Sequence, residues 1–126
     1  MEFNTNYDYS EFYKLVVTLI VRGYTVEVFN SYDGKQLNVY SQNSTMLGEK
    51  TFLWDAIIHY QSYGHEQGLL EIYGTIVSKF TSDDSVMGYL TADEILKYCP
   101  GYNKNLYIRG SVILKNMMAR SSNLKG

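Results

Sequence analysis

The sequence predicts an α+β fold, in which a small antiparallel β-sheet built around one hairpin packs against several helices in a single domain. Two patterns carry this prediction. Apolar residues recur at helical spacing near the N-terminus and over residues 51–80, whereas residues 24–41 alternate between apolar and polar side chains on both sides of a turn. The 126 residues suffice for one core. We therefore expect a single domain over residues 1–120 and a frayed tail over residues 121–126.

The first helix is expected over residues 8–22. Asp8 and Glu11 have the spacing of a capping box at its start, and Gly23 follows its end, where positive φ is common. The apolar residues of this segment form one stripe along the predicted helix. They are Phe12, Leu15, Val16, Leu19 and Ile20.

A β-hairpin is expected next. Residues 24–29 alternate around two β-branched valines, which indicates a strand. Asp33-Gly34 is typical of a hairpin turn, and residues 35–41 return as a second strand with Leu37 and Val39 facing the core. Residues 42–50 are polar and predict a loop, with a short strand over residues 45–47.

Residues 51–80 are expected to form two helices that meet at a tight elbow. Apolar residues recur at helical spacing on both sides of the polar segment 62–68, which carries two glycines. Thr51 is a suitable N-cap for the first of these helices. Four residues of the stretch are expected to be buried: Trp54, Ile57, Leu69 and Ile76.

The rest of the chain is expected to be mainly helical. After a loop over residues 81–88, Thr91 and Glu94 form a capping box that opens a short helix, which ends near residues 99–101. Residues 102–110 predict a strand or turn. A basic helix is expected to begin at about Ser111.

Residues 83–94 partly match the twelve-residue calcium loop of an EF-hand. Asp83, Gly88 and Glu94 stand at loop positions 1, 6 and 12, which supply a ligand, the sharp turn and the closing carboxylate. Met87 stands at position 5 and offers no oxygen, and the sequence has no second loop to pair with. We therefore expect Gly88 to form a turn, Glu94 to complete the capping box, and no metal to bind.

The sequence contains no catalytic or nucleotide-binding motif, so we expect no enzymatic activity, no catalytic residue and no cofactor. His59 and His65 are six residues apart, which is the wrong spacing for two metal ligands on one helical face. Cys99 is expected near a helix C-terminus, where the helix dipole raises a thiol pKa. It is the only cysteine, which fits a reducing cytoplasm. The longest apolar run is too short to span a membrane.

Charge is divided unevenly along the chain. Up to Glu94 there are 13 acidic and five basic residues, whereas the last 32 residues hold six basic residues and no acidic one. Basic side chains on a helix bind phosphates, although the same charges would also complement the acidic body. The alternative function is therefore a nucleic-acid-binding accessory or regulatory protein. Its contacts would come from Lys104, Arg109, Lys115 and Arg120.

Tyrosine occurs 13 times, which is consistent with a protein interface and equally with a core boundary that is short of phenylalanine. An interface would combine exposed acids, which speed association with a basic partner, and tyrosines, which slow dissociation. The acids assigned to this partner-binding surface are Glu27, Asp33, Glu49, Glu66, Asp83 and Asp84, and the tyrosines are Tyr32, Tyr60, Tyr63 and Tyr89.

Three segments, residues 54–56, 62–71 and 88–94, resemble small proteins of phages and mobile elements of Gram-positive bacteria. The resemblance extends over residues 52–98. Such elements carry counter-defence proteins, including anti-CRISPR proteins that inhibit type II CRISPR effector nucleases. The resemblance implies a small non-enzymatic protein that binds and inhibits a host defence nuclease in the host cytoplasm, with no cofactor.

Overall fold

The computed structural model describes residues 7–41 and 51–101. These residues form two α-helices, five β-strands and two short 3-10 helices. In chain order they are α1 (Ser10–Val21), β1 (Thr25–Ser31), β2 (Gly34–Tyr40), β3 (Phe52–Ile58), η1 (His65–Gln67), β4 (Leu70–Gly74), η2 (Thr75–Lys79), β5 (Val86–Leu90) and α2 (Ala92–Leu96).

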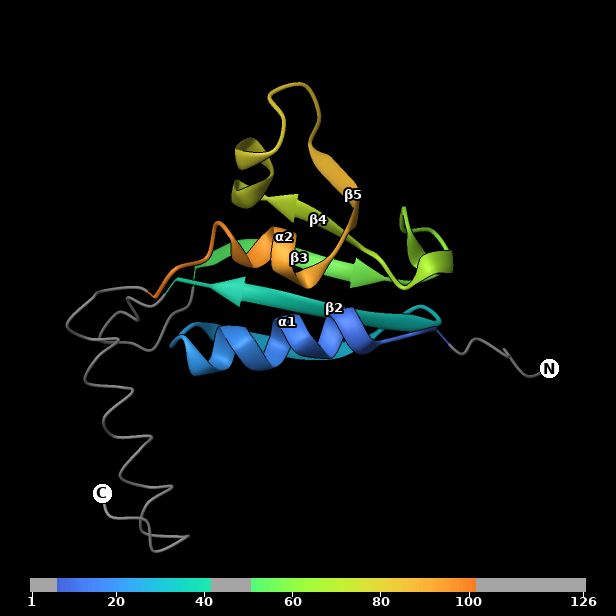
Figure 1. Ribbon diagram of the computed structural model, residues 1–126, viewed down its shortest axis with the longest axis horizontal. Coiled ribbons are helices and arrows are strands. Elements are labelled where there is room, and N and C mark those ends of the chain that lie inside the picture. The colour runs from blue at the N-terminus through green and yellow to red at the C-terminus, as the bar shows by residue number, and fades with distance from the viewer. Residues whose placement is uncertain (1–6, 42–50, 102–126) are drawn as a thin grey trace, which may run out of the picture.

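The five strands form one antiparallel sheet in which each strand pairs with its neighbour in the sequence, in the order β1-β2-β3-β4-β5. Helices α1 and α2 lie side by side on one face of this sheet (Figure 1). The predicted α+β class is therefore observed. The sheet is larger than the expected hairpin, and two α-helices pack against it in the described part of the chain where several were expected.

Helix α1 forms where the apolar stripe predicts it, but its ends differ in detail. The predicted capping box is absent, because Glu11 Oε1 accepts a hydrogen bond from the Ala92 backbone N–H at 2.7 Å and so ties α1 to the start of α2. Asp8 Oδ1 instead accepts from the Ser10 N–H at 2.9 Å. Gly23 has a φ of 94°, as expected after a helix. Ile20 is exposed and does not belong to the buried stripe.

The β1–β2 hairpin turns one residue earlier than predicted. Ser31 pairs with Gly34, so Tyr32 and Asp33 form the two-residue turn and Gly34 begins β2. Glycine is required at position 34 because a Cβ there would lie 1.8 Å from the carbonyl oxygen of Ile58 in β3. Leu37 is fully buried, as is Val39, and both face the core as predicted.

The predicted pair of helices over residues 51–80 is wrong, because the stretch forms β3, η1, β4 and η2. In β3, Trp54, Ala56 and Ile58 alternate inward and are buried. Apolar residues also occupy the opposite face of β3, and this hides the two-residue period that marks a half-buried strand. Thr51 consequently caps no helix. Its carbonyl accepts a hydrogen bond from the Ser41 N–H at 2.7 Å, beside the first residue of β3.

Alternation also explains which of the expected core residues are buried. Trp54 and Ile76 are buried as expected. Ile57 is half-buried because it lies three residues after Trp54 in a strand and therefore faces the other side of the sheet. Leu69 is half-buried because it precedes β4, in which Leu70 and Ile72 point into the core.

The segment after residue 80 forms less loop and more strand than expected. Residues 86–90 pair with β4 as β5, so residues 83–94 are not a loop between two helices and the EF-hand spacing is not realised. The capping box of α2 is confirmed. Thr91 Oγ1 accepts from the Glu94 N–H at 3.2 Å, and Glu94 Oε1 accepts from the Thr91 N–H at 2.9 Å. The expected strand over residues 45–47, the basic helix and the tail over residues 121–126 lie outside the described residues.

Replacement of Leu37 by alanine is predicted to destabilise the fold by about 2–5 kcal/mol, because the side chain is fully buried between the sheet and the helices and its loss leaves a cavity. The measurement is the free energy of unfolding in urea. Lys79→Ala on the exposed side of η2 is the control, with an expected change of about 0.5 kcal/mol or less. Equal losses for the two variants would contradict this description of the core.

Candidate protein-binding surface

Four exposed tyrosines gather at one end of the sheet. The antiparallel order brings the β1–β2 turn, the end of β3, the connection to β4 and the end of β5 to this end (Figure 1). Tyr32, Tyr60, Tyr63 and Tyr89, which we call the tyrosine surface, are 73, 52, 58 and 58% exposed. Large aromatic side chains with this exposure are typical of surfaces that bind other proteins.

The first half of this surface is the pair Tyr32 and Tyr60, whose ring centroids lie 5.8 Å apart. Asp33 holds the two segments together. Its Oδ1 accepts from the Tyr60 backbone N–H at 3.0 Å, and its Oδ2 accepts from the Tyr7 hydroxyl at 2.6 Å. Desolvation raises the pKa of Asp33, but these hydrogen bonds outweigh it and hold the pKa below its ordinary value. Asp33 therefore stays ionised and fixes the turn.

The second half is the pair Tyr63 and Tyr89, whose rings are stacked with centroids 6.4 Å apart and an angle of 15° between their planes. The backbones are also joined, because the Tyr89 N–H donates to the Tyr63 carbonyl at 3.2 Å. Gly88 permits this approach, since a Cβ there would lie 2.3 Å from the Cβ of Tyr63. The Tyr63 N–H in turn donates to Glu71 Oε1 at 2.9 Å. Both rings therefore stand on a hydrogen-bonded backbone.

Tyr32 and Tyr89 also share an unusual backbone conformation. They have φ angles of 53° and 59°, and they are the only residues other than glycine with positive φ in the described part of the chain. The left-handed region costs a bulky residue on the order of 1 kcal/mol or more, and such strain is concentrated at functional sites. One of the two strained residues lies in each half of the tyrosine surface.

The structure gathers six of the ten predicted partner-binding residues at this end. They are Tyr32, Asp33, Tyr60, Tyr63, Glu66 and Tyr89, with Glu66 exposed on η1. Glu27 lies on β1, where its Oε1 accepts from the Tyr40 hydroxyl at 2.7 Å. Asp83 and Asp84 lie before β5, near the opposite end of the sheet. Glu49 lies outside the described residues, as do Lys104, Arg109, Lys115 and Arg120.

Sequence reasoning missed three residues that support this end: Tyr7, His59 and His65. Tyr7 packs edge-on against His65, with ring centroids 5.7 Å apart. The two residues are 58 positions apart in the sequence, so no local pattern predicts the contact. His59 is buried, and burial lowers its pKa although Asp33 and Glu71 oppose the shift. Its Nδ1 accepts a hydrogen bond from the Gln61 N–H at 3.1 Å, which requires an unprotonated ring nitrogen. This bond stabilises the turn that follows β3.

The face of the sheet opposite the helices carries a hydrogen-bonded polar network. Gln36 Nε2 donates to Asn38 Oδ1 at 2.9 Å and to Asp55 Oδ2 at 3.3 Å. Asp55 is partly buried beside Glu71, which lies on the neighbouring strand β4. Burial, followed by repulsion from Glu71, raises the pKa of Asp55 to about 6. This network therefore contains an acid that titrates close to neutral pH.

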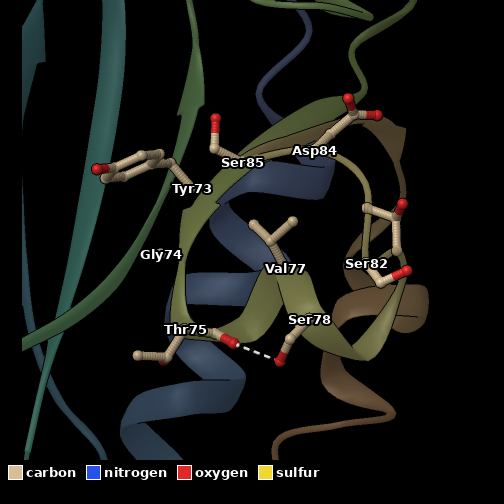
Figure 2. Close-up of a pocket in the computed structure, with 9 residues that line it drawn as sticks. Tyr73, Gly74, Thr75, Val77, Ser78, Ser82, Asp84 and Ser85 are labelled. Carbon is tan, nitrogen blue, oxygen red and sulfur yellow. Dashed lines mark hydrogen bonds between the residues drawn. The ribbon is translucent and has the colours of Figure 1, made fainter.

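A shallow pocket of about 570 Å³ lies between the end of β4, η2 and the bend before β5 (Figure 2). Hydroxyl groups dominate its lining, but several are already engaged. Figure 2 shows the Ser78 hydroxyl donating to the Thr75 carbonyl, at 3.0 Å. The Thr81 hydroxyl accepts from the Asp83 N–H at 3.1 Å. Two of its hydroxyl groups therefore stabilise the local backbone, and no cluster of charged side chains lines the pocket, since Asp84 is the only acidic or basic residue among its described lining residues.

Other candidates for chemistry are weak among the described residues. No group of three His, Cys, Asp or Glu side chains is placed to hold a metal ion in residues 7–41 and 51–101. Cys99 is buried, its thiol donates to the Ile95 carbonyl, and burial raises its pKa to about 11 in spite of Arg22. A thiol with this pKa is protonated at neutral pH and is a poor nucleophile. The described helices are also too short or too polar to cross a membrane.

Comparison with protein families, curated proteins and solved structures finds no match to this chain. Its function therefore has to be inferred from its own surface, where the tyrosine surface is the most clearly constructed feature.

Replacement of Asp55 by asparagine is predicted to stabilise the protein at pH 7–8 and to have little effect near pH 4. The folded state raises the pKa of Asp55, because its ionised form is partly buried beside Glu71. The contribution of Asp55 to the stability of the wild type therefore falls as pH rises from about 4 to about 6. After allowance for solvent screening we expect a gain on the order of 1 kcal/mol at pH 7. Urea unfolding of both proteins from pH 4 to 8 measures the difference, and a difference independent of pH would contradict the assignment.

Proposed function

We propose that this chain is a non-enzymatic protein-binding module that docks on its partner through the tyrosine surface. The observation that carries the proposal is the gathering of four exposed tyrosines on backbone that hydrogen bonds hold in place. Interface hot spots are enriched in tyrosine, because its ring buries a large apolar area while its hydroxyl keeps a polar partner.

Rigidity supports the same proposal. Binding normally costs free energy because side chains and loops lose freedom in the complex. In this surface the Asp33 carboxylate fixes one half, and the Tyr63–Tyr89 backbone bond fixes the other, before any partner arrives. Two of the four tyrosines also have positive φ angles, and such backbone conformations are concentrated at functional sites.

Charge indicates the kind of partner. The described residues hold eleven acidic and five basic side chains, a net charge of −6. An acidic body of this kind, with Asp33 and Glu66 at the tyrosine end, attracts a basic partner and speeds its association. Nucleic-acid enzymes present basic grooves to their substrates. Within our proposal the partner is therefore a host defence nuclease, in keeping with the resemblance to counter-defence proteins, and binding inhibits it.

The direct test is inhibition of purified type II CRISPR effector nucleases, each loaded with guide RNA, in a DNA-cleavage assay with the full chain. The proposal expects at least one nuclease to be bound and inhibited. Duplex DNA alone is the comparison for the nucleic-acid-binding alternative. Tight DNA binding that is lost when Lys115 and Arg120 are reversed to glutamate, with no nuclease bound, would contradict the proposal and favour the alternative.

Replacement of Tyr63 by alanine is predicted to speed dissociation from the partner about tenfold, because the ring leaves the centre of the buried contact. Surface-bound kinetics with the full chain measure the rate. Tyr73→Ala is the matched control, since Tyr73 is 50% exposed on β4 but lies toward the other end of that strand. Equal dissociation rates for the two variants would place the contact elsewhere.

Reversal of Glu66 to lysine is predicted to slow association severalfold at low salt and to have a smaller effect at high salt, because screening weakens electrostatic attraction between separated charges. The dissociation rate is expected to change little. Asp83→Lys carries the same charge change near the opposite end of the sheet and is the control. If Glu66→Lys leaves the salt dependence of association unchanged, this end of the molecule does not face a basic partner.

A further inference from the structure

Helix α1 carries a second apolar stripe on its exposed side. Tyr13, Val17, Ile20 and Val21 are 47, 58, 54 and 50% exposed. Val17, Ile20 and Val21 follow Tyr13 by four, seven and eight residues, which places all four on one face of the helix. This face is separate from the buried stripe that packs on the sheet. A helix with one buried side normally carries polar residues on the other, so apolar residues on both sides indicate a further contact.

The described chain ends beside this stripe. The Arg22 guanidinium donates to the carbonyls of Leu96 and Cys99, at 2.9 and 2.7 Å. The Tyr24 hydroxyl donates to the carbonyl of Pro100. These bonds hold the chain next to the C-terminal end of α1, immediately after Ile20 and Val21. The described chain therefore ends at one end of the exposed stripe.

We propose that the C-terminal segment, residues 102–126, folds back on the exposed stripe of α1 and covers it. The segment is long enough, since α1 has 12 residues and a helix of that length spans about 18 Å. The sequence pattern of residues 111–120 predicts an amphipathic helix with one apolar face. That face would consist of Ile113, Leu114, Met117 and Met118.

Charge favours this occupant over a second copy of the chain. Residues 102–126 contain five basic side chains and no acidic one, whereas the described residues carry a net charge of −6. The segment therefore brings opposite charge to the body, and the local concentration of an attached segment is high. A contact between two copies through their α1 helices would pair like surfaces and would lack this attraction between opposite charges.

The test is amide hydrogen exchange of the full chain, followed by mass spectrometry. In the wild type, amides of residues 111–120 are expected to exchange at least about tenfold more slowly than in a free peptide of the same sequence. Ile20→Asp and, separately, Val17→Asp should return their exchange toward the peptide rate, because each places a charge in the apolar contact. Exchange in β2, β3 and β4 should stay unchanged, which shows that each variant is folded.

Thr18→Asp is the matched control, because it adds the same charge to the same helix on a different side. It should leave the exchange of residues 111–120 as slow as in the wild type. Unprotected exchange of this segment in the wild type would overturn the proposal, as would protection that neither stripe variant reduces. Sedimentation that shows a wild-type dimer, dissociated by Ile20→Asp, would assign the stripe to a second copy and also overturn it.

Discussion

The Asp33 carboxylate is the interaction on which the tyrosine end of the molecule depends. It joins three segments that are distant in the sequence: the chain before α1 through Tyr7, the β1–β2 turn to which it belongs, and the end of β3 through the Tyr60 N–H. The bond from the Tyr7 hydroxyl is 2.6 Å long and that from the Tyr60 N–H is 3.0 Å, and together they keep the carboxylate charged. Without this acceptor the turn would lose its hydrogen bond to the segment after β3, and the link between Tyr32 and that segment would depend on ring contacts with His59 and Tyr60.

Rigidity at this end coexists with exposure, and the two have separate physical origins. Backbone hydrogen bonds and the close approach at Gly88 determine where the rings stand. The rings themselves remain half in water because they lie beyond the core, which sits between the sheet and the two helices. A surface of this kind keeps its shape without a partner and retains apolar area for one to cover.

Much of the fold follows from the sequence where one pattern dominates. The buried stripe of α1 apart from Ile20, the hairpin strands with Leu37 and Val39, and the capping box of α2 are observed as local patterns predict. The error over residues 51–80 has a specific cause. In β3, Leu53 and Ile57 are apolar on the face opposite Trp54 and Ala56, so the strand has no clean alternation and its apolar residues also fit a helical period.

The candidate site was predictable in composition but not in arrangement. Exposed tyrosines and acids could be selected by residue type, and six of those selected lie together. Which of them meet depends on strand order, since Tyr32 reaches Tyr60, and Tyr63 reaches Tyr89, only when the sheet is assembled. Glu27 on β1, and Asp83 and Asp84 before β5, have the right chemistry but lie away from the tyrosine surface, and local sequence carries no information about that separation.

The order of the strands has a consequence for how the protein folds. Every strand pairs with its neighbour in the sequence, so the sheet can grow by successive hairpins with small losses of chain entropy. The contact between α1 and α2 is different, because Glu11 meets Ala92, and Lys14 meets Asp93, across about eighty residues. On a ribosome the sheet can therefore begin to form while α2 is still unsynthesised, and arrival of α2 closes the structure in a late, long-range step.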